Sequence, residues 1–147
     1  MTEACHTCGA VLPEGSTCQT IFDEFLALEF SDPRYGQVHF LTVACFLVQH
    51  NGYSDCALVW IQSALNNYLE DERNTQQIRR KAVKSMAEYS KEIRRKPDAA
   101  PLPKVAWSMT IADVAAQIHD AESYCKLIEQ WGYTTLQEMT ALHMGRI

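Results

Sequence analysis

The sequence predicts an all-α fold, a single-domain helical bundle of about six helices with a zinc-knuckle loop at its N-terminus. Apolar residues recur at helical spacing, capping residues precede several apolar stretches, and no stretch alternates between apolar and polar residues as a half-buried strand would. A chain of 147 residues, 47% of them hydrophobic, can bury one core. The single domain 1–147 is expected to comprise the zinc-knuckle loop (1–18), four helices (19–95), a proline-rich connector (96–109) and the C-terminal helices (110–147).

The first two helices are predicted between the loop and residue 50. Ser16 and Gln19 match a Ser-x-x-Gln capping box, in which each side chain accepts a hydrogen bond from the other residue's free amide. Pro33 is expected to break this first helix, because proline lacks an amide hydrogen. The second helix, over about residues 36–50, is apolar around most of its circumference, which is typical of a buried central helix.

A third and a fourth helix complete the set over residues 19–95. Ser54 can cap the third helix and Asn74 the fourth, since both side chains accept hydrogen bonds from helix amides. The fourth helix has one apolar face, and its other face is basic and expected to be solvent-facing. The basic residues are Arg80, Lys84, Lys91 and Arg95.

The connector and the C-terminal helices follow. Three prolines between residues 96 and 109 predict an extended segment. Thr110 and Asp113 match a second capping box, which begins a long helix. Gly132 is expected to break this helix, and a short helix over about residues 134–143 closes the chain.

The composition favours a cytoplasmic protein without membrane association. The N-terminus has neither the basic nor the apolar segment of a signal peptide. The longest apolar run, residues 38–48, is far shorter than the ~20 residues of a membrane span. Six cysteines in a reducing compartment favour metal binding or buried thiols over disulfides.

The charge is distributed unevenly along the chain. The net charge is −5, yet ten of the 13 lysines and arginines fall within residues 73–104. Glu88 and Glu92 interrupt this basic block at helical spacing, and the sequence pI is about 5.5, which together argue against a dedicated nucleic-acid-binding protein. A protein partner or a second copy of the chain is the partner we expect.

The most specific signal is the Cys-x-x-Cys-Gly segment at residues 5–9. Two thiolates at this spacing can bind one zinc ion across a tight turn, and Gly9 allows the positive φ that such a turn requires. Cys18 follows at the expected start of a helix, where the helix dipole should favour its thiolate form. Cys5, Cys8 and Cys18 are therefore predicted ligands of one structural zinc ion, although a thiolate-rich site also suits iron.

A closed site needs a fourth ligand, and His50 is our first choice. If the first two helices form an antiparallel hairpin that turns near Pro33, the end of the second lies beside Cys18. His39 would lie near the turn, on the order of 15 Å away, and is the second choice. Cys56 is the third. Free thiols and a redox pair are the alternatives to zinc, but redox Cys-x-x-Cys motifs usually belong to a βαβ setting, which is not predicted here.

The chain resembles an uncharacterised bacterial family of short proteins, a domain of unknown function. The matching segments are Cys5–Ala10, Cys18 with Phe22, Leu26–Glu29, Asp32-Pro33, Val38–Val43, Gln49-His50, Tyr53-Ser54 and Trp107–Val114. One departure is Asn51, where the resemblance leads us to expect proline. The resemblance implies a shared site built from these motifs and no assigned activity.

These observations favour a zinc-binding helical interaction or regulatory module. No catalytic motif is evident, so the expectation leans away from an enzyme. One alternative is a zinc-dependent enzyme with an open metal position and a base such as His39 or Glu29. The other is a nucleic-acid-binding regulator that uses the basic helix over residues 73–96.

Overall fold

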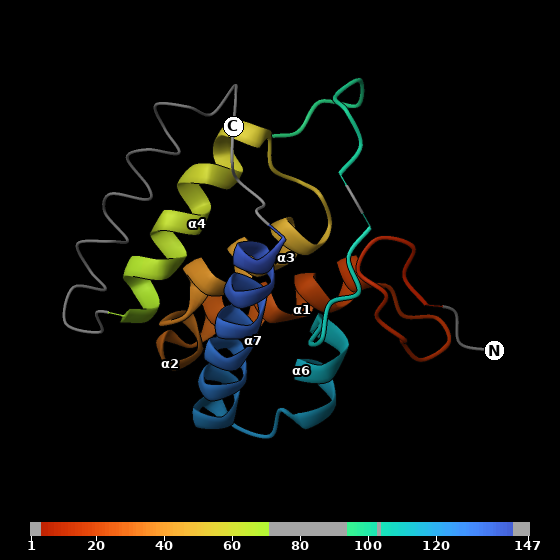
Figure 1. Cartoon of the computed structure of the whole chain (residues 1–147). Coiled ribbons are helices and arrows are strands. Elements are labelled where there is room, and N and C mark those ends of the chain that lie inside the picture. Colours follow the sequence, from red (N-terminus) through yellow and green to blue (C-terminus); the bar gives the residue numbers. More distant parts are fainter. Residues whose placement is uncertain (1–3, 71–93, 103, 143–147) are drawn as a thin grey trace.

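A computed structural model describes residues 4–70, 94–102 and 104–142 of the chain (Figure 1). In these ranges the chain forms six helices and only two isolated antiparallel bridges, so the predicted all-α class is confirmed. No helix in them is long and apolar enough to cross a membrane. The helices are α1 (Cys18–Ser31), α2 (Pro33–Gly36), α3 (His39–Gln49), α4 (Asp55–Glu70), α6 (Ile111–Gln117) and α7 (Ala121–Ala141).

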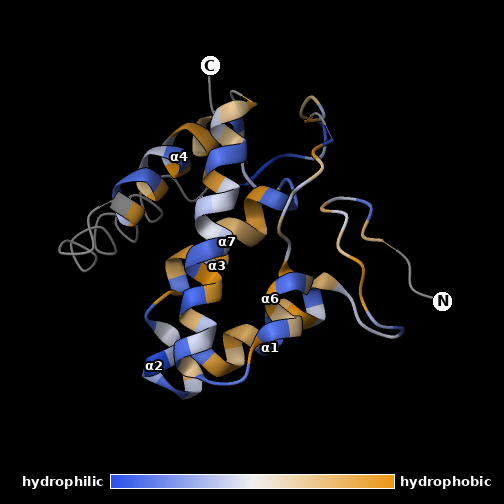
Figure 2. Cartoon of the chain, turned by 60° about the horizontal axis from the view of Figure 1, so that its bottom comes forward, coloured by the Kyte–Doolittle hydropathy of each residue, from blue (hydrophilic) through white to orange (hydrophobic). Residues whose placement is uncertain are grey.

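The long helix α7 and the apolar helix α3 form the centre of the arrangement. Helix α7 packs against α2, α3, α4 and α6, while α1 packs against α2, α3 and α6 (Figure 1). Helix α7 carries both hydrophilic and hydrophobic residues along its length (Figure 2), whereas no residue of α3 is exposed. Leu41, Cys45 and Val48 on α3 are completely buried, which confirms the prediction of a central buried helix.

The capping box of α1 lies one residue later than predicted. Thr17, not Ser16, is the N-cap: its Oγ1 accepts the amide hydrogen of Thr20 at 3.1 Å, and the Oγ1 of Thr20 accepts the amide hydrogen of Thr17 at 2.9 Å. A threonine pair fills the same role as the expected Ser-x-x-Gln pair, because only two side-chain acceptors at this spacing are required. The shift makes Cys18 the first helical residue.

Pro33 ends α1 and also begins a further short helix. Asp32 separates the two, and its carboxylate accepts the amide hydrogen of Arg34 at 3.0 Å, so it caps α2. Proline is favoured at the first helical position, where no amide hydrogen is needed. The second helix, predicted over about residues 36–50, corresponds to α3, which starts at His39 after α2 ends at Gly36.

The break in the C-terminal helix lies at residues 118–120 and not at Gly132. Helix α6 ends at Gln117, and Asp120 caps α7 by accepting the amide hydrogen of Ser123 at 2.7 Å. Gly132 lies inside α7, where a Cβ atom would be 3.2 Å from Cδ2 of Leu41 on α3. This glycine therefore permits the close approach of α7 to α3. The second predicted capping box, at the start of α6, is confirmed.

Arg95 is not the free surface residue that the basic-face prediction implied. Its side chain is only 9% exposed, and its Nη1 lies 2.7 Å from a carboxylate oxygen of Asp55, beside the cap of α4. Nη2 donates to the carbonyl of Ala100. Ser54 caps α4 as predicted, accepting the amide hydrogen of Ala57 at 3.1 Å. The rest of the predicted fourth helix and its other basic residues lie outside the described residues.

A buried carboxylate joins α1, α3 and α7. The Oε1 atom of Glu29 lies 2.7 Å from Nδ1 of His39, and the side chain of Glu29 is only 1% exposed. Its Oε2 accepts hydrogen bonds from the hydroxyls of Thr42 (2.6 Å) and Tyr124. Burial, together with the neighbouring carboxylate, raises the pKa of Tyr124, so its hydroxyl stays protonated and donates.

Removing the hydroxyl of Tyr124 should weaken this network. We expect Tyr124→Phe to lower the free energy of unfolding by about 2 kcal/mol, because a buried hydrogen bond to a charged acceptor is lost. Urea unfolding followed by circular dichroism measures the change. Tyr133→Phe is the matched control, since Tyr133 is 48% exposed and donates to a backbone carbonyl. Equal losses in the two variants would contradict the importance of the Glu29 network.

Position 132 tests the contact between α7 and α3. Gly132→Ala should destabilise the protein by about 1 kcal/mol, because overpacking against fully buried Leu41 outweighs the better helix propensity of alanine. The cost should shrink when Leu41→Val is introduced as well, and a double-mutant cycle measures this coupling. An unchanged cost in the double variant would show that Leu41 is not the obstacle.

Candidate metal centre

The N-terminal loop is shaped by backbone hydrogen bonds around its Cys-x-x-Cys turn. The amide of Cys5 donates to the carbonyl of Ala10 at 2.8 Å, and the amide of Gly9 donates to the carbonyl of Cys5 at 2.9 Å. Gly9 has φ of +82°, a conformation that side chains disfavour, as the turn was predicted to require. These hydrogen bonds close a small hairpin in which Cys5 and Cys8 lie close together.

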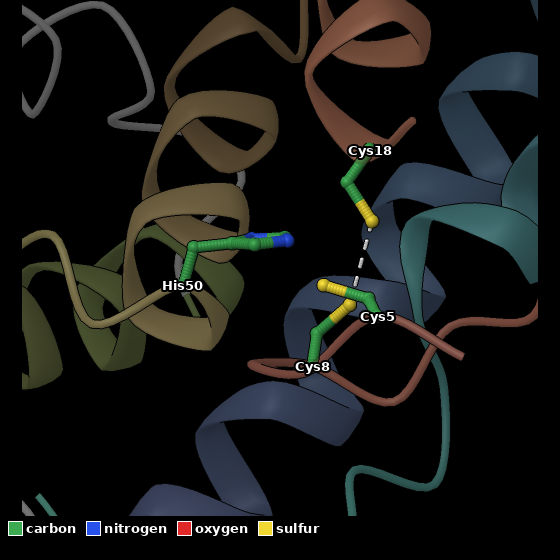
Figure 3. A group of neighbouring side chains, drawn as sticks. All are labelled: Cys5, Cys8, Cys18 and His50. Carbon is green, nitrogen blue, oxygen red and sulfur yellow. Dashed lines mark hydrogen bonds between the residues drawn. The ribbon is translucent and has the colours of Figure 1, made fainter. Parts of the chain in front are cut away.

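Cys18 brings a third sulfur to this hairpin from the first turn of α1. Its Sγ is 3.6 Å from Sγ of Cys8, and both residues are buried, with exposed fractions of 6% and 1% (Figure 3). The amide of Ala10 donates to Sγ of Cys8 at 3.4 Å. Cys5 completes the trio and is only partly buried. One edge of the sulfur cluster is therefore closer to solvent than the rest.

His50 faces the three sulfurs from the end of α3 (Figure 3). Its Nδ1 lies 2.8 Å from the carbonyl oxygen of Phe46, and its ring stacks on the Phe46 ring at 4.3 Å. A carbonyl only accepts hydrogen bonds, so Nδ1 carries the proton and Nε2 presents a lone pair. Burial lowers the pKa of His50, which favours the neutral ring. Nε2 is buried, and none of the described residues hydrogen-bonds to it.

The four ligand atoms are spaced for one small ion. One atom each from Cys5, Cys8, Cys18 and His50 lies within 4.8 Å of the others. Zinc–sulfur bonds of about 2.3 Å in a tetrahedron place two sulfurs about 3.8 Å apart, close to the 3.6 Å between Cys8 and Cys18. Among the described residues the group includes neither His39 nor Cys56, the other two candidates for the fourth ligand.

Comparison with known families gives one match over nearly the whole chain. The family of unknown function DUF5946 matches residues 3–140. The chain belongs to the DUF5946 family. The match confirms the resemblance to a domain of unknown function and contains all four residues of the group. Comparisons with curated proteins and with solved structures found no match.

Burial and the neighbouring thiols set the pKa values of the three cysteines in this DUF5946 site. Burial raises the pKa of Cys5, but the amides of Cys8 and Thr7 and the neighbouring thiols outweigh it and bring that pKa below the usual value. Burial and the adjacent thiols raise the pKa of Cys18, opposite to the effect expected from the helix dipole. Burial also raises the pKa of Cys8. Three thiolates in this volume repel one another, and a divalent cation would offset that repulsion.

Two further polar residues of the DUF5946 chain are Gln49, which lies next to the site, and Glu29, which lies apart from it. The Nε2 atom of Gln49, next to His50, donates to the carbonyl of Met109 at 2.8 Å and to Oγ1 of Thr135 at 3.0 Å. This anchors the end of α3 on the connector and α7. A polar residue on an apolar helix is expected to hydrogen-bond to loop backbone, and Gln49 does so at Met109. Glu29, a candidate base, lies instead in the separate buried network.

Proposed function

We propose that the protein binds one structural zinc ion through Cys5, Cys8, Cys18 and His50, and that it serves as a zinc-stabilised interaction or regulatory module. The observation that carries the proposal is the buried Nε2 atom of His50, which faces three sulfurs and has no hydrogen-bond partner in the part of the chain that the structure describes. A buried polar atom without a partner is costly, and a metal ion would satisfy it.

The donor set favours zinc in a closed site. Three thiolates and one imidazole are a common set for structural zinc, whereas catalytic zinc keeps one position open for water. The hydrogen bond from His50 to the carbonyl of Phe46 is the outer-shell contact that typically orients a ligating histidine. With four protein ligands at hand, we assign the ion a structural role.

Zinc would connect three parts of the chain. Cys5 and Cys8 belong to the loop, Cys18 begins α1 and His50 follows α3. The ion would hold the loop against the first helical hairpin and add its binding energy to folding. The functional surface then belongs to the assembled helices, and its partner would be another protein or a second copy of the chain.

The two alternatives have less support. A zinc enzyme needs an open metal position and a free base, whereas the candidate bases Glu29 and His39 bind each other at 2.7 Å. A nucleic-acid-binding role for the basic segment would use Arg95, whose side chain is engaged by Asp55 and Ala100. Neither alternative explains the orientation of His50.

The identity of the fourth ligand can be tested by metal content. Elemental mass spectrometry of tag-free protein should find about one zinc per chain, and His50→Ala should lose most of it, because three ligands bind zinc more weakly than four. His39→Ala is the matched control on the same helix and should keep its zinc. Full retention in both variants would point to a water as the fourth ligand and so to the enzyme alternative.

Loss of a sulfur ligand should also destabilise the fold. Cys18→Ser should release the zinc and lower the melting temperature by roughly 10 °C, because the ion's contribution of several kcal/mol to folding disappears. Differential scanning calorimetry measures the shift. Cys56→Ser is the control, since Cys56 is exposed and lies outside the group. Unchanged metal content in Cys18→Ser would remove Cys18 from the ligand set.

A further inference from the structure

Two of the four candidate ligands are already in contact with each other. Sγ of Cys8 and Sγ of Cys18 are 3.6 Å apart (Figure 3). A disulfide requires about 2.05 Å, so a closing movement of roughly 1.6 Å would join them. The two cysteines lie on different elements, the loop and the first turn of α1, so a bond between them would link two of the three parts that the metal would join.

We propose that the metal centre is also a redox switch, in which a hydroperoxide oxidises Cys8 and Cys18 to a disulfide and zinc is released. This inference rests on the proposed function, since it adds a mode of regulation to the same site. Cysteine binds zinc as a thiolate, and a disulfide supplies none, so oxidation of this pair would leave Cys5 and His50 as the remaining ligands of the group.

The chemistry balances with hydrogen peroxide as the two-electron oxidant. One sulfur of the pair attacks a peroxide oxygen, the O–O bond breaks, and hydroxide leaves while the sulfur becomes a sulfenic acid. The second sulfur attacks the first, an S–S bond forms as the S–O bond breaks, and a second hydroxide leaves. Each hydroxide takes up a proton, so two waters form, and zinc departs as Zn²⁺ without changing its oxidation state.

A small oxidant can approach the cluster from the side of Cys5. This residue is only partly buried, so the cluster lies close to solvent on that side.

Oxidation would change which elements are held together. Zinc would link the loop, α1 and the end of α3, whereas the disulfide links only the loop and α1. Nε2 of His50 would lose the ion as its partner, and among the described residues no group hydrogen-bonds to that atom. The switch would therefore loosen the knuckle from the end of α3 while the knuckle stays attached to α1.

The test treats zinc-loaded, full-length protein with hydrogen peroxide in a Cys56→Ser/Cys125→Ser background. These two substitutions remove a fully exposed and a partly exposed thiol outside the group. A chromogenic chelator reports zinc release, thiol titration counts free cysteines, and peptide mass spectrometry maps disulfides. We expect one zinc released per disulfide, free thiols falling from four to two, a Cys8–Cys18 linkage, and recovery of thiols and zinc binding after dithiothreitol.

Two kinds of failure are distinguishable. Protein that never holds zinc would overturn the proposed function. Zinc-loaded protein that keeps its metal under peroxide, or loses it with any linkage other than Cys8–Cys18, would overturn the switch alone. Cys5→Ser provides a second check, because it should lose zinc yet still form the Cys8–Cys18 disulfide, since the contacting pair is intact. Failure of that variant to form it would also refute the inference.

Discussion

The deep burial of α3 is the constraint on which the rest of the structure depends. Thr42 and Gln49 on this helix are almost completely buried, so their side chains need hydrogen-bond partners within the protein. Thr42 meets this need through Glu29 on α1, and Gln49 through Met109 and Thr135. The hydrogen bonds of Thr42 and Gln49 therefore hold α3 in position against α1, the connector and α7.

The ring of His50, at the end of α3, has a hydrogen-bond partner for only one of its two nitrogens among the described residues. Its Nδ1 is satisfied by a carbonyl one turn earlier, but its Nε2 points at sulfur atoms and not at a hydrogen-bond partner. The carboxylate of Glu29 and Nε2 of Gln49 have hydrogen-bond partners within the protein, whereas Nε2 of His50 has none among the described residues. A structural zinc ion at this point would bind that atom and attach the N-terminal loop to the bundle.

Local features were predictable from the sequence, and features set by distant contacts were not. The capping box at Thr110 and the close approach of the knuckle cysteines depend on short spacings, and the position of His50 followed from simple hairpin geometry. Gly132 was misjudged because its role depends on how closely α7 approaches Leu41. Arg95 was misjudged because its partner, Asp55, lies 40 residues earlier in the chain.

The order of the candidate ligands along the chain has a consequence for synthesis on the ribosome. All four lie within the first 50 residues, whereas Met109, which anchors the end of α3, is 60 residues beyond Gln49. At typical translation rates those 60 residues take roughly 3–12 s. Throughout that interval an ion can cross-link the nascent N-terminal hairpin, while α7 does not yet exist to cover it. Zinc supply during translation would thus decide whether the N-terminal segment, including the apolar helix α3, is ordered or unfolded before α7 is made.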